Sequence, residues 1–250
     1  MRYWTMAAVP LALAMTLTAC NASVSGGGKE QAGETRDAGP VTTQDFALTG
    51  FTGVEVTGPD DVTIRQGTAF SISATGPKAE IDELEVRLDG QTLSIGRKRE
   101  GFNFRRGGKG VKIAITMPRL DRLRLTGSGS IDADAVEGDA VEAALTGSGD
   151  LKIAKLTGKT AKISVSGSGD VEIDGGSADS AELSVTGSGD IDASDLTVAT
   201  IDVAVTGSGD VAAKATGKAD ISILGSGDVE LTGGATCSTS RMGSGTATCK

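Results

Sequence analysis

The sequence contains no histidine among its 250 residues, and its carboxylates are spread evenly along the chain. Histidine is the commonest general base and the central member of the usual serine or cysteine triad, so both kinds of catalysis are disfavoured. No two acidic residues stand out as an acid–base couple. A zinc site is also disfavoured, because two cysteines without histidine offer too few good ligands. We therefore expect no enzymatic activity, no metal and no cofactor.

Aromatic residues are also scarce. The only tyrosine and tryptophan are Tyr3 and Trp4, and no Phe, Tyr or Trp follows position 125. This argues against the main enzymatic alternative, a polysaccharide lyase built on a β-helix, because such enzymes usually grip sugars with aromatic rings. Fold alone does not decide function. A further alternative left open is a periplasmic partner in envelope-stress signalling.

What the sequence has in abundance is glycine, and much of it lies in one tetrapeptide. Gly-Ser-Gly-Asp recurs with a period of 20 residues, beginning at Gly147, Gly167, Gly187 and Gly207. A further copy begins at Gly225, and variants begin at Gly127 and Gly243. A fixed period of this length is typical of a solenoid, in which one coil cannot bury its own apolar face alone.

Alternating apolar and polar residues flank each copy, as in Ala161-Lys-Ile-Ser-Val165 before Gly167. This period of two predicts strands with one buried and one wet face. We therefore predict an all-β protein in which residues 126–250 form a parallel β-helix with coils of about 20 residues. Residues 45–125 are also rich in strands, as opening coils of the same solenoid or as a sandwich that caps it.

Stacked coils would place the aspartates of the tetrapeptides in one column: Asp150, Asp170, Asp190, Asp210 and Asp228. Like charges at the spacing of paired strands repel by roughly 1 kcal/mol in water, so something must offset this cost. Either the carboxylates accept hydrogen bonds from backbone N–H groups and cap the turns, or they bind a column of cations such as calcium. We expect capping, because one carboxylate per repeat falls short of the six to eight oxygens that calcium prefers.

The first 19 residues have the features of a signal peptide, with Arg2 ahead of an apolar run too short to span a bilayer. They lead into Leu17-Thr-Ala-Cys20, which resembles the lipobox of bacterial lipoproteins and implies lipidation of Cys20. Asn21, where inner-membrane lipoproteins often carry Asp, favours the outer membrane. Residues 20–44 are predicted to form a flexible tether with a reach of about 27 Å.

A basic segment interrupts this acidic chain, whose formal net charge is −9. It surrounds Phe102 and Phe104 and contains Arg97, Lys98, Arg99, Arg105, Arg106 and Lys109. Outside the cytoplasm nucleic acid is not an expected partner, so lipid phosphates or acidic glycans are better candidates for a polyanion site. The alternative, which we favour, is a solvated hairpin whose charges keep an edge strand from pairing.

Two further cysteines, Cys237 and Cys249, lie six residues on either side of Gly243, at positions that point inward in earlier coils. An exported protein meets an oxidising compartment, so we predict a disulfide that closes the last coil. That coil departs from the pattern in another way, since Arg241 stands where the middle coils have Val or Ile.

The order of these features is similar to that of one known family. After the lipoprotein signal the matching segments are Phe51-Thr-Gly-Val-Glu-Val, Leu93-Ser-Ile, Ile113-Ala-Ile-Thr-Met-Pro-Arg-Leu120 and Leu125-Thr-Gly-Ser-Gly129. The chain thus resembles the head GIN domain family of autotransporter-adhesin-like bacterial lipoproteins, from about Phe46 to the last repeat. The resemblance implies a parallel β-helix-like fold, a place in the cell envelope and a non-enzymatic, adhesive role. Envelope glycans or another envelope protein are then the expected partners, besides the membrane itself.

Overall fold

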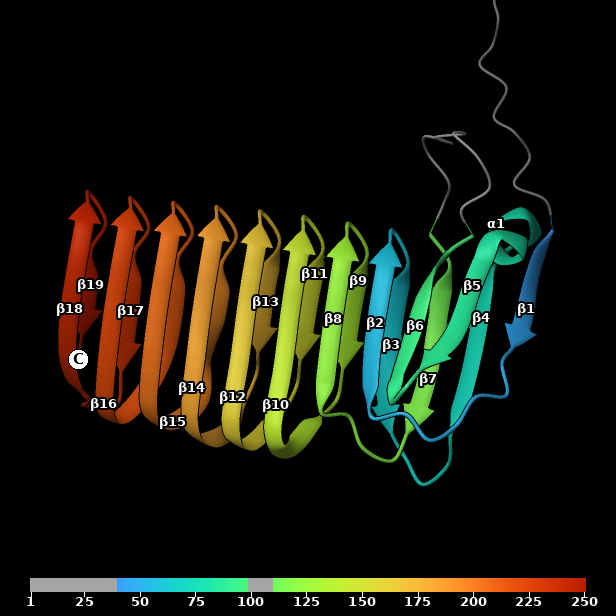
Figure 1. Cartoon of the computed structure of the whole chain (residues 1–250), viewed down its shortest axis with the longest axis horizontal. Helices are drawn as coiled ribbons and strands as arrows, with labels where there is room; N and C mark the ends of the chain where they lie inside the picture. Colours follow the sequence, from blue (N-terminus) through green and yellow to red (C-terminus); the bar gives the residue numbers. More distant parts are fainter. Residues whose placement is uncertain (1–39, 99–109) are drawn as a thin grey trace, which may run out of the picture. The chain divides into compact units, whose positions relative to one another are not determined.

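The structure, a computed structural model, describes residues 40–98 and 110–250. Within these ranges the chain forms a β-solenoid, which confirms the fold that the 20-residue period predicts (Figure 1). Each coil contributes a strand to one sheet, the front sheet, turns sharply, and contributes a shorter strand to a second sheet, the rear sheet. Equivalent strands pair in parallel and in register, so that Ala161 lies between Val141 and Ala181.

The core is a set of ladders between the two sheets. One ladder on the front side consists of Leu125, Leu145, Val165, Val185, Val205 and Ile223, none more than 2% exposed. These residues occupy the same position of successive coils, and parallel stacking therefore buries each against two near-copies of itself. In the coils after residue 125, Val, Ile, Leu and Ala fill this narrow interior without aromatic residues.

The Gly-Ser-Gly turn is explained by how closely successive coils approach. Gly187 has a φ of 126°, and a Cβ there would lie 2.2 Å from the carbonyl oxygen of Gly167. A Cβ on Gly189 would lie 2.1 Å from the carbonyl oxygen of Gly169. The first glycine is thus needed for its backbone angle and for space, and the second for space alone. The close approach lets the Ser188 N–H donate to the Gly167 carbonyl at 2.8 Å.

The strands of the regular coils divide between the two sheets. The front sheet contains β8 (Arg122–Gly127), most of β10 (Val136–Gly147), β12 (Leu156–Gly167) and β14 (Gly176–Gly187), and β18 (Thr236–Gly243). The rear sheet contains β9 (Ser130–Ala133), β11 (Asp150–Ile153), β13 (Asp170–Ile173), β17 (Val229–Thr232) and β19 (Ala247–Cys249). Two long strands, β15 (Ile191–Gly207) and β16 (Val211–Gly225), start in the rear sheet and continue into the front sheet.

The N-terminal part contains coils of the solenoid and a cap of antiparallel strands. Its elements are β1 (Val41–Asp45), β2 (Gly53–Gly58), β3 (Asp61–Gln66), β4 (Ser71–Pro77), α1 (Lys78–Glu83), β5 (Leu84–Asp89), β6 (Thr92–Arg97) and β7 (Lys112–Met117). Strands β2 and β3 form one coil, and β6 and β7 form another. Antiparallel strands then close the end, because β5 pairs with β6, β4 with β7, and β1 with β4.

The coils of this part are not stacked in chain order. The β2–β3 coil lies between the β6–β7 coil on its outer side and the β8–β9 coil on its inner side. After β7 the chain therefore crosses back over the first coil, where the Asp121 N–H donates to the Thr52 carbonyl at 2.8 Å. The short helix α1 was not predicted; it follows Pro77, whose fixed φ suits the start of a helix.

Candidate interaction surfaces

A groove crosses the strands of the front sheet and passes over successive coils. It consists of two hollows, of about 450 and 420 Å³, that share Glu182 and Asp202. Small side chains outside the core, such as Ala140 and Ser180, line it. We call it the front groove, and its charged row comes from one equivalent position of six coils: Arg122, Glu142, Lys162, Glu182, Asp202 and Asp220.

The charges of the front groove differ between its two halves. Arg122 Nε donates to Glu142 Oε2 at 3.2 Å, and Lys162 Nζ to Glu182 Oε1 at 3.0 Å, so the half nearer β8 is largely neutralised. In the other half Asp202 and Asp220 lie side by side in register. Neither has an ion-pair partner among the described residues. Unpaired like charges in adjacent strands repel, so a ligand with positive or hydrogen-bond donor groups would be favoured there.

The aspartates of the tetrapeptides form the expected column on the rear sheet, and hydrogen bonds connect most of them. The Asp190 N–H donates to Asp170 Oδ1 at 3.0 Å, and the Asp210 N–H donates to Asp190 Oδ1 at 2.7 Å. The Asp228 N–H donates in the same way to Asp210 Oδ1, also at 2.7 Å. Each carboxylate thus caps the turn of the following coil rather than its own. Asp150 stacks in register with Asp170, whose N–H donates to the Gly149 carbonyl instead.

The last member of the column has the most hydrogen bonds. Asp228 Oδ1 accepts from both the N–H and the Oγ1–H of Thr246, each at 2.8 Å. These bonds favour the ionised form and lower the pKa of the Asp228 carboxyl, with the hydroxyl contributing most. Elsewhere on the rear sheet the Glu172 and Asp174 carboxylates raise the pKa of Lys152. In the part of the chain that the structure describes, no three acidic or cysteine side chains are arranged to hold a metal ion.

Of the basic segment, only Arg97 and Lys98 lie within the described residues; Arg99, Arg105, Arg106 and Lys109 lie outside them. Arg97 makes its contacts within the protein. Its guanidinium donates to the Asp60 carboxylate, to the Glu80 carboxylate at 3.0 Å and to the Glu80 carbonyl at 2.8 Å. Lys98 Nζ donates to the Asp82 carbonyl at 2.8 Å. Arg97 therefore joins α1 to the first coil instead of reaching toward a polyanion.

Asp60 is a functional residue of the fold that the sequence pattern did not identify. It occupies the place of the second glycine in the Gly-Ser-Gly turn and is fully buried. Its Oδ1 accepts from Arg97 and from the Val111 N–H at 2.8 Å, whereas its buried Oδ2 has no partner among the described residues. A buried charge of this kind depends on its partner, so the Asp60–Arg97 pair holds the cap to the solenoid. The sequence signal was an aspartate at a position that otherwise carries glycine.

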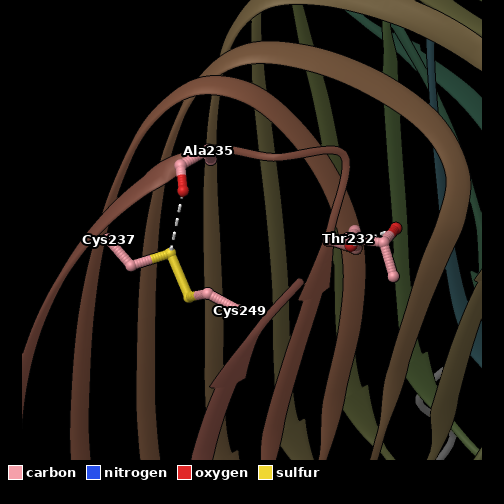
Figure 2. The surroundings of a disulfide bond; sticks show 5 residues. Thr232, Ala235, Cys237 and Cys249 are labelled. Atoms are coloured by element: carbon pink, nitrogen blue, oxygen red, sulfur yellow. Dashed lines mark hydrogen bonds between the residues drawn. A yellow bond between two sulfur atoms is a disulfide. The ribbon is translucent and has the colours of Figure 1, made fainter.

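At the other end of the solenoid the structure contains a disulfide between Cys237 and Cys249 (Figure 2). It joins β18 of the front sheet to β19 of the rear sheet, and the two Cα atoms are 6.7 Å apart. In the same coil, Arg241 takes the place that Ile223 has in the preceding coil, and it is exposed. The terminal coil is therefore closed by a covalent bond and carries a charge in an inward position.

Cys20, the signal segment and most of the tether lie outside the described residues. Within the described ranges no helix is long and apolar enough to cross a membrane. The lipid anchor thus remains a prediction from the sequence.

The family model described as "Putative auto-transporter adhesin, head GIN domain" matches residues 50–235, from the start of the first coil almost to the terminal coil. The chain belongs to the head GIN domain family. The matched region contains the front groove up to Asp220, the aspartate column and the Asp60–Arg97 pair. No curated protein sequence matches the chain.

Several solved structures share the fold of this head GIN domain protein. A putative adhesin from Bacteroides fragilis has a TM-score of 0.72 at 24% identity, covering 84% of this chain and 97% of its own. A putative lipid binding protein from Parabacteroides distasonis has a TM-score of 0.66 at 24% identity, covering 85% and 97%. A putative adhesin from Parabacteroides merdae has a TM-score of 0.65 at 18% identity, covering 85% and 97%. At these identities the likeness establishes the fold.

Proposed function

We propose that this head GIN domain protein is a non-catalytic adhesive module that a lipid on Cys20 holds at the outer membrane. The observation that carries the proposal is the family match over residues 50–235, together with structural neighbours described as adhesins. The front groove supports it, because a groove that presents equivalent side chains on successive coils suits a long, repetitive partner. We propose an envelope glycan or an extended segment of another envelope protein as that partner.

The charged side chains of the front groove support binding better than catalysis. Its basic and acidic groups form ion pairs with one another near β8, where Glu142 also accepts from Arg124. Lys162, Glu182, Asp202 and Asp220 are exposed to solvent. Catalytic acids and bases are usually shielded from water by burial. The polysaccharide lyase alternative therefore has no support from this groove.

Two measurements test the proposal. Cys20→Ala should move the protein from the membrane fraction to the soluble fraction; persistence in the membrane would refute the anchor. For binding, immobilised envelope glycans and envelope protein extracts should retain the chain, and Asp202→Lys with Asp220→Lys should reduce retention at least severalfold. The matched control is Asp192→Lys, an exposed aspartate of the rear sheet that lies outside the groove. Equal retention of all three proteins would exclude the front groove, and glycan cleavage would overturn the non-catalytic assignment.

A further inference from the structure

The two outermost strands at the C-terminal end have free edges. Among the described residues, β18 pairs only with β16, and β19 pairs only with β17. The outer N–H and C=O groups of these strands could therefore pair with another chain. At the N-terminal end the outermost strands are β1 and β5, which continue the two sheets beyond the coils as antiparallel strands (Figure 1).

The terminal coil differs from the coil that it covers. In β16 and β17 the inward positions carry buried, uncharged residues, namely Ala219, Ile221, Ile223, Val229 and Leu231. Their register partners in the terminal coil are Cys237, Thr239, Arg241, Ala247 and Cys249. An inward-pointing charge on an edge strand is one of the devices that prevent edge-to-edge pairing, because joining two edges would bury it. The terminal coil therefore protects an edge that would otherwise be apolar.

Within the described residues, the terminal coil is the only coil that contains a disulfide. Thr239, Arg241 and Cys249 are exposed, so the coil buries little apolar surface of its own. Segments with few buried contacts open at low free energy. The Cys237–Cys249 bond ties the front strand to the rear strand across the open end (Figure 2). Without it, we expect β18 and β19 to separate from the solenoid first.

We propose that the terminal coil is a redox-sensitive end cap, and that its release lets the β16–β17 edge pair with the same edge of a second copy. A dithiol reductant supplies two electrons and two protons; the sulfur–sulfur bond breaks, two thiols form, and the dithiol becomes a disulfide. The released edge presents the uncharged ladder of Ala219, Ile221 and Ile223. A two-fold axis perpendicular to the sheets would pair β16 and its copy antiparallel in one sheet and β17 and its copy in the other.

We expect the partner of the released β16–β17 edge to be a second copy of the chain, because of the structure of the N-terminal end. Head-to-tail stacking cannot match the two ends strand for strand, because the N-terminal end has one extra strand beyond β6, namely β5, and two beyond β7, namely β4 and β1. Only like ends can then join, and a two-fold dimer uses the same surface of both chains. This inference does not rest on the adhesive function, and either could fail alone.

The test uses the full chain with Cys20→Ala, which removes the third thiol, and measures molar mass in solution by light scattering. We expect a monomer in the oxidised state and a concentration-dependent doubling of the molar mass after dithiothreitol. Cys237→Ala with Cys249→Ala should show the same doubling without reductant. A chain that stays monomeric after both thiols have become reactive to an alkylating agent would contradict the inference. Growth beyond a dimer with loss of the β-sheet circular dichroism signal would contradict it too, because the whole solenoid would then have unfolded.

Discussion

The two ends of the solenoid solve the same problem in different ways. Both must end a stack of parallel coils whose edges invite further pairing. At the N-terminal end the chain folds back on itself, and antiparallel strands and α1 cover the outermost coil. At the C-terminal end no further element is added, and a disulfide and the inward charge of Arg241 take the place of a cap.

A charged residue in an inward position has opposite roles at the two ends of the solenoid. Arg97, at the N-terminal end, is largely buried and completes an ion pair with a carboxylate that has no access to water. Arg241, at the C-terminal end, is exposed and has no ion-pair partner among the described residues. The first charge is required for the packing of the cap, and the second keeps a surface from being packed.

The largest loss of stability is therefore expected for Arg97→Ala. This change leaves Asp60 as a buried charge without its main partner, and removal of one partner of a buried pair costs about 3–5 kcal/mol. Urea unfolding of the protein would measure the loss in the free energy of unfolding. The matched control is Arg241→Ala, which should change the free energy of unfolding by no more than about 0.5 kcal/mol. Equal losses at the two ends would contradict the distinction between them.

A smaller loss of stability is expected in the coils between the two ends, where an aspartate of one coil caps the turn of the next coil. Asp190→Ala removes the acceptor for the Asp210 N–H and should cost about 1 kcal/mol. Asp202→Ala is the control, because it relieves repulsion from Asp220 in the adjacent strand and should cost nothing. Millimolar calcium should leave the Tm of the unmodified chain unchanged. A rise of several degrees that disappears in Asp190→Ala would show a cation column instead of capping.

The smallest effect concerns pH at the C-terminal end. Because the folded-state pKa of Asp228 lies below its ordinary value of 3.8, its contribution to stability is complete above that value and is lost as pH falls through the folded pKa. Thr246→Val removes the hydroxyl that lowers this pKa most and leaves the backbone donor. The Asp228 pKa, followed by NMR, should then rise toward its ordinary value. An unchanged pKa would mean that the hydroxyl bond is absent in solution.

The repeat explains why so much of the fold could be predicted. A period of 20 with alternating residues specifies both the coil and its inward positions, and the register pairs Ala161 with Ala181 as the spacing implies. The order of the first coils could not be predicted, because β2–β3 and β6–β7 have no shared tetrapeptide that shows how they stack. The helix α1 could not be predicted either, because its six residues are too few to show a helical periodicity.

The candidate sites were less predictable, for a physical reason. Asp60 and Arg97 are 37 residues apart, and they meet because the β6–β7 coil stacks on the β2–β3 coil. From the sequence Arg97 belongs to a basic segment; in the structure its environment is a buried carboxylate. The front groove could not be predicted either, although its charged row repeats at intervals of 20 residues and finally 18, because a groove depends on the small residues beside that row.

The most direct test of the difference between the two ends is hydrogen exchange of the backbone amides with and without dithiothreitol. Reduction should raise exchange in residues 236–249 and leave the coils before β16 and the N-terminal cap unchanged, because only the terminal coil is held by the disulfide. Unchanged exchange in residues 236–249 after complete reduction would contradict this difference. So would an increase spread evenly over all coils, since both ends would then depend on the same bond.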